Sequence, residues 1–505
     1  MGASCCESDS AHDSGMNTRE ARTEFQQQRL TVEQLFDLLE KQEQTIHRLQ
    51  AEIDRVKQRL AQYEPEIQSE SKQGDSPSGA ATRYSLEAEE KRRRRRRKKK
   101  KSPGRRKTHL KFAEAERTKD IDPDNIRRAD CELARERAVW RLEDGRAVLV
   151  GYRVFRGPNG VEGRIPGVTK RCEYGIEILV VLSFLVYVIG ISLEKACVVL
   201  RFFCRLSLSK SQADALLRQL ARHWEAEFDT LCDLLVHATV VYMDETGWKV
   251  GTEGCSLWTF ASKFQRVFLF GCRKDGDTLD QMLPPDVFDG VRVSDDAAVY
   301  RRRFVQAQKC WAHLLRKAIR LALLYPRKKT YQRFLDQLLQ LFYDAKRAAA
   351  DQRLGLSGRE KRVAELEGRL CGLCNPHSHQ KPDMKPHERD FANLANELLE
   401  RMMDEELFTF VLNPEVEATN NLPERLQRSP AQDRKAGRTS KTAAGARRRS
   451  VIVSVLESLR VNLPEFTLDR VLEEVKRWMT EGVSLFTRQW QNITEGSTEL
   501  IFDTG

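Results

Sequence analysis

The sequence lacks an apolar run long enough to cross a membrane. The longest such run, residues 176–191, contains Glu177 and falls short of the roughly 20 apolar residues that a transmembrane helix needs. The first residues are polar and lack the apolar segment of a secretory signal. We therefore expect a cytoplasmic protein with no membrane partner, in which residues 176–191 form a buried helix.

Regularly spaced cysteine pairs, which would indicate a disulfide framework, are also lacking. The twelve cysteines are scattered, and several of them, such as Cys197, Cys204 and Cys310, lie in apolar stretches. This pattern is typical of reduced, buried thiols in a protein of the cytosol. A chain of 505 residues, 40% of them hydrophobic, is long enough for two to four folded units with cores of their own.

One short segment carries ligand types that suit zinc. It holds Cys371, Cys374, His377 and His379, a Cys-x-x-Cys pair followed closely by two histidines. The histidines lie nearer to the cysteines than in the usual zinc sites. We therefore favour loop residues without a metal, and keep a zinc site as the alternative.

The positive charge of the chain is concentrated in one segment. Of the formal net charge of +12, eleven charges belong to the unbroken basic run at residues 91–101, so the rest of the chain is nearly neutral. Such a run forms no core and suits salt-sensitive contact with DNA phosphates; a solubilising or targeting tail is the alternative. The residues expected to contact DNA are Arg92, Arg93, Arg94, Arg95, Arg96, Arg97, Lys98, Lys99, Lys100 and Lys101.

The clearest periodic signal lies in residues 30–64. Apolar residues recur there in steps of three and four, with Gln42 as the only polar residue on the stripe, and Pro65 ends the helix. A stripe this narrow predicts a coiled coil that joins copies of the chain into a homo-oligomer; a helix packed on its own domain is the alternative. We expect residues 1–29 to be disordered and residues 65–108 to be a linker.

The next two segments are expected to form a small mixed domain and a helical region. Residues 109–174 contain short alternating stretches, and residues 147–154 fit a strand. Residues 175–235 turn helical, with two helices joined by a short polar turn and a serine-capped start of the second. This pair fits a DNA-reading helix-turn-helix, but an ordinary pair of packed helices fits as well.

From residue 236 to residue 324 strands and helices alternate. Three strands come first, followed by helix, strand, helix, strand and helix, an order that predicts an α/β domain of the ribonuclease-H-like type. The first strand ends in Asp244 and the fourth in Asp295. Carboxylates on neighbouring strand ends repel one another unless a divalent cation lies between them, which favours Mg²⁺. The alternative is that both are turn or cap residues.

Several motifs resemble the insertion-sequence-66 family of transposases. They are Met243-Asp244-Glu245-Thr246-Gly247-Trp248, Val293-Ser294-Asp295, Cys310-Trp311-Ala312-His313-Leu314-Leu315-Arg316 and Thr419-Asn420-Asn421-Leu422-Pro423-Glu424-Arg425. The resemblance runs in the family's order from about residue 175 to residue 460, and a coiled coil suits the family. Relatives often carry paired Cys-x-x-Cys ligands before the catalytic domain; residues 108–172 lack them, so we expect no zinc ribbon there.

The resemblance implies a DDE recombinase that cuts and joins DNA at the ends of an insertion sequence, in a bacterial, nucleoid-associated setting. Its implied carboxylates are Asp244, Asp295 and Glu424, which would hold two Mg²⁺ (or Mn²⁺) ions at the scissile phosphate. Glu245 and Asp296 stand beside two of them. Strand alternation allows only one residue of each adjacent pair to face the cleft.

The implied catalytic core is interrupted along the chain. We expect its first part at residues 236–324, a helical insertion at residues 325–415, its second part with the Glu424 helix at residues 416–485, and a tail at residues 486–505. The basic, small-residue-rich stretch 429–449 is expected to be a mobile loop that contacts DNA.

Three further residues near the motifs have open roles. Lys309 and Arg425 could contact phosphate, although ordinary surface charges are the favoured alternative, and His313 either lines the cleft or lies at the edge of the core. Two rival functions also stay open. One is an inactive or domesticated DNA-binding relative, and the other is a ribonuclease-H-like nuclease without strand transfer.

Overall fold

The structure is a computed structural model. It describes residues 108–169, 172–295, 297–300, 306–379 and 381–495, with Gln44 alone before them. The predicted coiled coil, apart from Gln44, and the basic run at residues 91–101 lie outside the described residues. Contacts divide the chain into two units, residues 1–104 and residues 105–505, and all elements described below belong to the second.

The second unit begins with a three-stranded sheet. Its elements are the short helix α4 (Thr108–Ala113) and the strands β1 (Arg117–Ile121), β2 (Glu132–Glu143) and β3 (Arg146–Arg156), in the order β1-β3-β2. Asp144 and Gly145 both have a positive φ, as a two-residue hairpin turn between twisted strands requires. The strand predicted at residues 147–154 is thus confirmed as part of β3.

A helical region follows. It consists of α5 (Ile176–Ser183) with a π-helical turn (Phe184–Val188), α6 (Leu193–Cys204), α7 (Lys210–His223) and α8 (Glu225–Val236). Almost every side chain of α5 is buried, which confirms the buried helix. The charge within the apolar run is paired, because Arg141 Nε donates to Glu177 Oε1 at 2.5 Å. Ser209 and Gln212 form a capping box that starts α7 after the turn.

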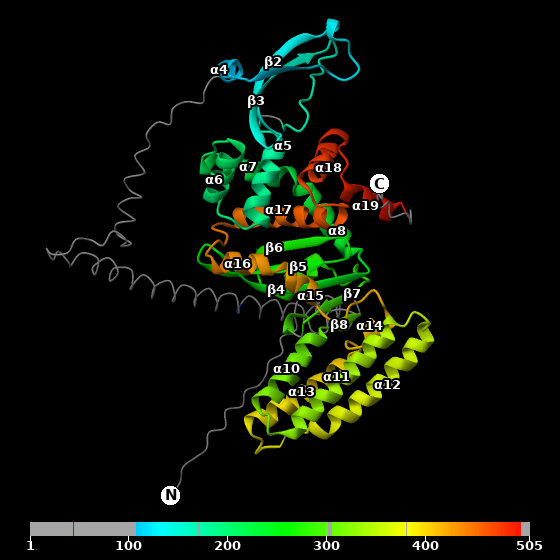
Figure 1. The fold of residues 1–505 in the computed structure, drawn as a ribbon. Helices are drawn as coiled ribbons and strands as arrows, with labels where there is room; N and C mark the ends of the chain where they lie inside the picture. Colours follow the sequence, from blue (N-terminus) through cyan, green and yellow to red (C-terminus); the bar gives the residue numbers. More distant parts are fainter. Residues whose placement is uncertain are drawn as a thin grey trace, which may run out of the picture. The chain divides into compact units, whose positions relative to one another are not determined.

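A five-stranded sheet lies at the centre of the unit (Figure 1). Its strands are β4 (Val240–Val250), β5 (Glu253–Ala261), β6 (Arg266–Cys272), β7 (Val291–Ser294) and β8 (Ala307–Lys309), in the order β6-β5-β4-β7-β8. The first three strands are antiparallel, whereas β7 and β8 run parallel to β4. Helix α9 (Gly276–Met282) precedes β7. The strands and the first and last helices predicted for residues 236–324 are confirmed, whereas the described residues between β7 and β8 hold only a 3₁₀ turn (Ala298–Tyr300) where a helix was predicted. The fold is a mixed α/β fold.

Helix α17 (Ala443–Asn462) covers the open edge of β6 (Figure 1). Three serines of the helix, spaced four residues apart, each accept one hydrogen bond from the strand. Their donors are the backbone N–H groups of alternate residues of β6. The pairs are Phe270 N to Ser450 Oγ at 2.9 Å, Phe268 N to Ser454 Oγ at 2.8 Å and Arg266 N to Ser458 Oγ at 2.9 Å. The spacings match because four helical residues rise about 6 Å and two strand residues about 6.6 Å. The helix thereby satisfies the donors of an edge strand.

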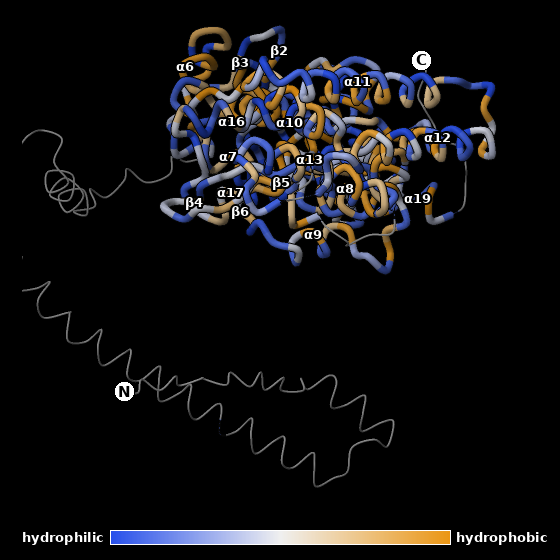
Figure 2. Tube along the Cα trace, turned by 90° about the horizontal axis from the view of Figure 1, so that it is seen from below, coloured by the Kyte–Doolittle hydropathy of each residue, from blue (hydrophilic) through white to orange (hydrophobic). Residues whose placement is uncertain are grey.

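The helices after β8 share one core with a face of the five-stranded sheet. They are α10 (Trp311–Leu324), α11 (Lys329–Ala350), α12 (Leu356–Cys374), α13 (Pro386–Met403) and the short α14 (Thr409–Leu412). In Figure 2, α11 and α12 alternate between hydrophilic and hydrophobic colours along their length, as amphipathic helices do. Their apolar side chains pack together with those of α10 and α13. The helical character predicted for residues 325–415 is confirmed.

The C-terminal part is helical as well. Its elements are α15 (Asn421–Leu426), α16 (Arg428–Lys435), α17, α18 (Leu468–Glu481) and α19 (Leu485–Thr494). The prediction of a mobile loop at residues 429–449 is wrong, because α16 and the start of α17 occupy most of it. Asp433 is buried there and forms ion pairs with Arg438 and Arg449, so part of the basic character of this stretch balances an internal charge. Among the described residues, no helix combines the length and apolar character needed to cross a membrane.

Candidate active site

Asp244 and Asp295 lie at one place on the five-stranded sheet. Strand β4 pairs in parallel with β7, with Tyr242 opposite Val293. The same register two residues further along brings Asp244 beside Asp295, on strands that neighbour each other about 4.8 Å apart. The two predicted aspartates are therefore adjacent because of the strand pairing, although 51 positions separate them in the sequence.

The two aspartates also share one face of the sheet. Val240 and Tyr242 on β4 pack with Val291 and Val293 on β7 into the core that contains α10. Because side chains alternate along a strand, Asp244 and Asp295 extend this same face. Both carboxylates are therefore directed to the side on which α10 packs against the sheet.

Glu245 extends the opposite face, with Met243 before it. Its carboxylate accepts a hydrogen bond from the Tyr300 hydroxyl and forms an ion pair with Lys274, and only 3% of its side chain is exposed. Glu245 thus has a neutralising environment of its own. Of the two adjacent acids, Asp244 is therefore the one that faces α10. Asp296, the acid next to Asp295, lies outside the described residues.

Glu424 reaches the same region from helix α15. Asn420, the residue before this helix, donates from Nδ2 to the Met243 carbonyl at 2.7 Å and from its backbone N–H to Cys310 Sγ at 3.1 Å. These bonds tie the start of α15 to β4 and to the start of α10. The carboxylate of Glu424 lies 3.2 Å from Arg316 and 3.7 Å from His313 Nε2.

The three predicted carboxylates, called the carboxylate cluster below, interact electrostatically. The pKa of Asp244 is raised to about 8 by burial first and then by the negative charges of Glu245, Asp295 and Glu424. Such an effect requires these groups to lie near Asp244. A group of like charges with a strongly shifted pKa is a common sign of a functional site.

The two open cations near the motifs differ in their surroundings. Lys309 is not a surface charge, as had been favoured, because only 1% of it is exposed. Its ammonium lies 3.5 Å from Ser294 Oγ, 3.4 Å from the Asp295 carbonyl and 3.8 Å from Glu406. Lys309 is the last residue of the short strand β8, whose three residues are all buried. Arg425 is exposed, in agreement with the surface position favoured for it.

His313 lies at the rim of the cluster, with 32% of its side chain exposed. Burial and Arg316 lower the pKa of its imidazole, while Glu424 and Asp295 oppose that shift. The imidazole is therefore neutral near pH 7 and available as an acceptor or a ligand. Of the two alternatives for His313, a place beside the carboxylates is the one that the structure shows.

The four candidate zinc ligands of the insertion have other contacts. Cys371 Sγ lies 3.9 Å from Met402 Sδ, and the ring of His377 packs against Phe334 and Phe391. Within the described residues, the potential ligands that converge are instead Cys310, His313 and Glu424. The segment at residues 371–379 shows no such convergence.

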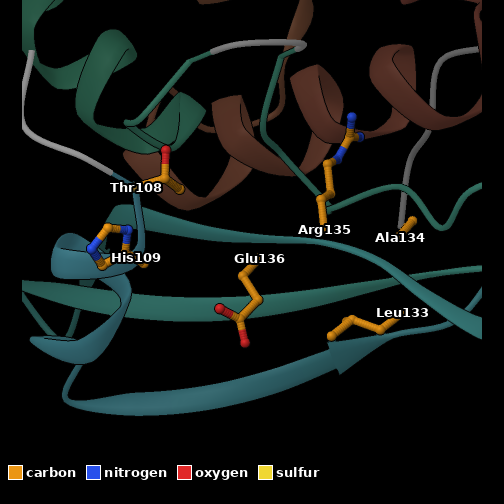
Figure 3. Close-up of a pocket in the computed structure, with 6 residues that line it drawn as sticks. All are labelled: Thr108, His109, Leu133, Ala134, Arg135 and Glu136. Atoms are coloured by element: carbon orange, nitrogen blue, oxygen red, sulfur yellow. The ribbon is translucent and has the colours of Figure 1, made fainter.

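A cavity of about 630 Å³ lies elsewhere in the unit (Figure 3). Its walls come from the start of α4 and from β2, and its lining residues are Thr108, His109, Leu133, Ala134, Arg135 and Glu136. Neither element carries one of the predicted catalytic residues. The cavity is therefore separate from the carboxylate cluster.

Some residues of the site could not be recognised from the sequence. Lys274 follows β6 by two positions and belongs to no motif, so nothing indicated that it would meet Glu245. Asn420 and Cys310 belong to two of the recognised motifs. Their membership marked both residues as candidates, but it did not predict that they contact each other. Arg316 ends the recognised motif that begins at Cys310, but no role was predicted for it.

Comparison with known families gives a match over this part of the chain. A family model described as "Transposase IS66 family" matches residues 171–448, which is more than half of the chain. The matched range contains every residue of the carboxylate cluster. A search among curated proteins gave no match.

Proposed function

The chain belongs to the IS66 family of transposases, and from this premise we propose that it cleaves DNA and transfers DNA strands with Asp244, Asp295 and Glu424. The observation that carries the proposal is the parallel pairing of β4 with β7, which brings Asp244 beside Asp295 on one face of the sheet. Glu424 lies near enough to contribute to the raised pKa of Asp244, and groups with strongly shifted pKa values are candidates for a functional site.

The strand arrangement supports a ribonuclease-H-like catalytic domain. Three antiparallel strands are followed by two strands parallel to the first, and the sheet order β6-β5-β4-β7-β8 places the first strand at the centre. In this proposal the central strand and its parallel neighbour supply two carboxylates, and a later helix supplies the third. Helices α11, α12 and α13 lie between the two strands and α15 in the sequence. In the fold, Asn420 still ties the start of α15 to β4.

Divalent cations of the Mg²⁺ or Mn²⁺ type fit the cluster. All three proposed ligands are carboxylates, the donors that hard cations prefer. The pKa of Asp244 is raised by burial and then by neighbouring negative charge, and a cation would neutralise that charge. Asp244, Asp295 and Glu424 would hold two such ions. When bound, these ions would polarise the scissile phosphate and the attacking and leaving oxygens.

The chain's own residues would hold and orient this assembly. Asp244 and Asp295 stand on paired strands, so their separation is fixed by the backbone, and Asn420 fixes the start of the Glu424 helix. The buried Lys309 lies against the Asp295 carbonyl and thereby holds the end of β7. Arg425 and Arg316 are exposed near the carboxylates and would contact DNA phosphates, which positions the strand without reading its sequence.

Other parts of the chain would bind DNA away from the chemistry. We assign phosphate contacts to the basic run at residues 91–101, and dimer formation to the coiled coil at residues 30–64. The turn between α6 and α7 would serve in a helix-turn-helix. These roles place the protein on DNA in the cytoplasm, as a homo-oligomer that joins two ends of an insertion sequence.

Strand transfer on defined DNA tests the proposal. The purified full chain is incubated with Mg²⁺ or Mn²⁺, a target plasmid and labelled DNA that carries the ends of its own element, either intact or already cut. We expect new 3′-ends on the intact DNA and covalent joining of the cut DNA to the plasmid. Cleavage without joining would assign a nuclease, and a DNA-bound protein with neither product would assign an inactive relative.

A further inference from the structure

A thiol, an imidazole and a carboxylate converge beside the two aspartates. The side-chain ligand atoms of Cys310, His313 and Glu424 all lie within 4.8 Å of one another. This set differs in chemistry from the three carboxylates, because sulfur and nitrogen are soft or borderline donors whereas carboxylate oxygens are hard.

Two local features bring these three side chains together: the start of α10 and a hydrogen bond that ties α15 to it. Cys310 precedes α10, and His313 follows three positions later, so both lie at the first turn of the helix. Glu424 comes from α15, whose start is bound to Cys310 through the Asn420 N–H. The site thus spans two helices that are connected at the thiol itself.

We propose that Cys310, His313 and Glu424 form a second cation site, selective for Zn²⁺ and similar borderline cations, that shares Glu424 with the aspartate pair. Cysteine, histidine and glutamate are all established zinc ligands, and three protein ligands with an open fourth position suit an exchangeable ion. The sharing of Glu424 rests on the proposed function, whereas the binding of the ion does not.

The distances suit such an ion after small movements. His313 Nε2 and Glu424 Oε1 are 3.7 Å apart, close to the roughly 3.4 Å between two ligands about 2.0–2.2 Å from a tetrahedral zinc ion. About one third of each of these two side chains is exposed, so both can adjust by rotation. Cys310 is buried and fixed, and it anchors the site.

The surroundings of the thiol support the assignment independently. Burial raises the pKa of the Cys310 thiol, and the Asn420 N–H, which points at Sγ, opposes that shift. The Asn420 side chain is 1% exposed, and its Nδ2 is bonded to the Met243 carbonyl, whereas its Oδ1 has no hydrogen-bond partner among the described residues. Asn420 thus holds a donor against the sulfur from a buried position.

Sharing of Glu424 has a functional consequence. A glutamate that ligates zinc together with Cys310 is withdrawn from Asp244 and Asp295. Zinc would therefore inhibit Mg²⁺-dependent DNA cleavage by competing for one carboxylate, and it would do so without blocking DNA binding.

Cobalt(II) gives a direct test of the binding. The full chain is titrated with Co²⁺, which replaces zinc and produces sulfur-to-cobalt charge-transfer absorption when a thiolate ligates it. We expect this absorption in the natural chain, its loss in Cys310→Ser, and an affinity at least about tenfold weaker in His313→Gln. The His313 side chain is about one third exposed, so His313→Gln reports on the site even if Cys310→Ser unfolds.

Cys371→Ser is the matched control, because Cys371 belongs to the other cysteine and histidine segment. Its absorption should equal that of the natural chain. Charge-transfer absorption that disappears in Cys371→Ser and persists in His313→Gln would overturn the proposal, as would its absence from the natural chain.

The sharing is tested by inhibition. DNA cleavage is measured at fixed Mg²⁺ with increasing Zn²⁺. The Zn²⁺ concentration that halves cleavage should be at least about tenfold higher for His313→Gln than for the natural chain. Equal inhibition of both proteins would overturn the sharing. If cobalt binds through Cys310 but the natural chain does not cleave DNA, the cation site stands and the proposed function fails. If the natural chain cleaves DNA but gives no cobalt signal, the proposed function stands and the cation site fails.

Discussion

The two faces of strand β4 carry acidic residues in opposite circumstances. On one face Glu245 meets a hydroxyl and an ammonium group, from Tyr300 and Lys274. On the other face, burial and then the charges of Glu245, Asp295 and Glu424 raise the pKa of Asp244 to about 8. The residues are adjacent in sequence and have the same charge, so the difference comes from the surroundings that the fold supplies.

This contrast distinguishes a structural carboxylate from a functional one. The buried charge of Glu245 is balanced, so removing one of its partners should destabilise the fold. The charge of Asp244 destabilises the metal-free fold because it is buried and because its neighbours repel it. Substitutions on the two faces should therefore have opposite effects on stability and on activity.

The largest effect is expected at the third carboxylate. Glu424→Gln removes a proposed cation ligand and should reduce strand cleavage at least about a hundredfold, with no loss in the free energy of unfolding. The readout is cleavage of labelled DNA at saturating Mg²⁺. Glu417→Gln, an exposed carboxylate four residues before Asn421, is the control and should keep its activity. Equal activity of Glu424→Gln and Glu417→Gln would remove Glu424 from the site.

The balanced face should respond in stability instead. Tyr300→Phe removes a donor from the buried Glu245 carboxylate and should lower the free energy of unfolding by about 2 kcal/mol, as measured by urea denaturation. Tyr343→Phe, at a 57% exposed tyrosine, should change it by far less. Unaltered stability in Tyr300→Phe would show that Glu245 does not depend on this partner.

The crowded face should become more stable when a charge is removed. The pKa of Asp244 is raised from 3.8 to about 8 in the folded protein, so the folded state binds this proton more tightly than the unfolded state does. Stability from this group is therefore complete below about pH 4 and is lost as the pH rises towards 8.

Asp244→Asn should accordingly raise the free energy of unfolding by about 1 kcal/mol at pH 8 in metal-free buffer, after allowance for solvent screening. The gain should shrink as the pH falls towards 4. Urea denaturation at several pH values measures it, and Glu245→Gln serves as the matched variant, for which no gain is expected. A loss of stability in Asp244→Asn at pH 8 would contradict the assignment of repulsion to this face.

The smallest expected effect is stabilisation by the cation. Mg²⁺ at a concentration equal to its dissociation constant should stabilise the natural chain by about 0.4 kcal/mol, seen as a rise in the melting temperature. The rise should persist in Glu245→Gln and vanish in Asp295→Asn. The same rise in both variants would place Mg²⁺ elsewhere on the protein.

The sequence predicted the parts of this site that depend on local pattern. Buried strands that end in Asp244 and Asp295 could be recognised because apolar runs and their ends are local features. Strand alternation showed that Asp244 and Glu245 must face opposite ways, but only the packing of Tyr242 against the α10 side shows which one belongs to the site.

The errors arose where long-range contacts override local composition. Lys309 looked like a surface charge, yet the short strand β8 holds it in the interior. The basic stretch 429–449 looked like a mobile loop, yet Asp433 binds Arg438 and Arg449 inside the fold. A charge count cannot show that a cation has a buried partner elsewhere in the chain.

The most direct test of the central claim compares the two neighbours on β4. DNA strand cleavage with Mg²⁺ is measured side by side for the natural chain, Asp244→Asn and Glu245→Gln, each checked for folding by circular dichroism. We predict that Asp244→Asn loses cleavage by at least about a hundredfold and that Glu245→Gln retains most of it. Loss in folded Glu245→Gln with activity kept in Asp244→Asn would contradict the assignment and move the site to the opposite face of the sheet.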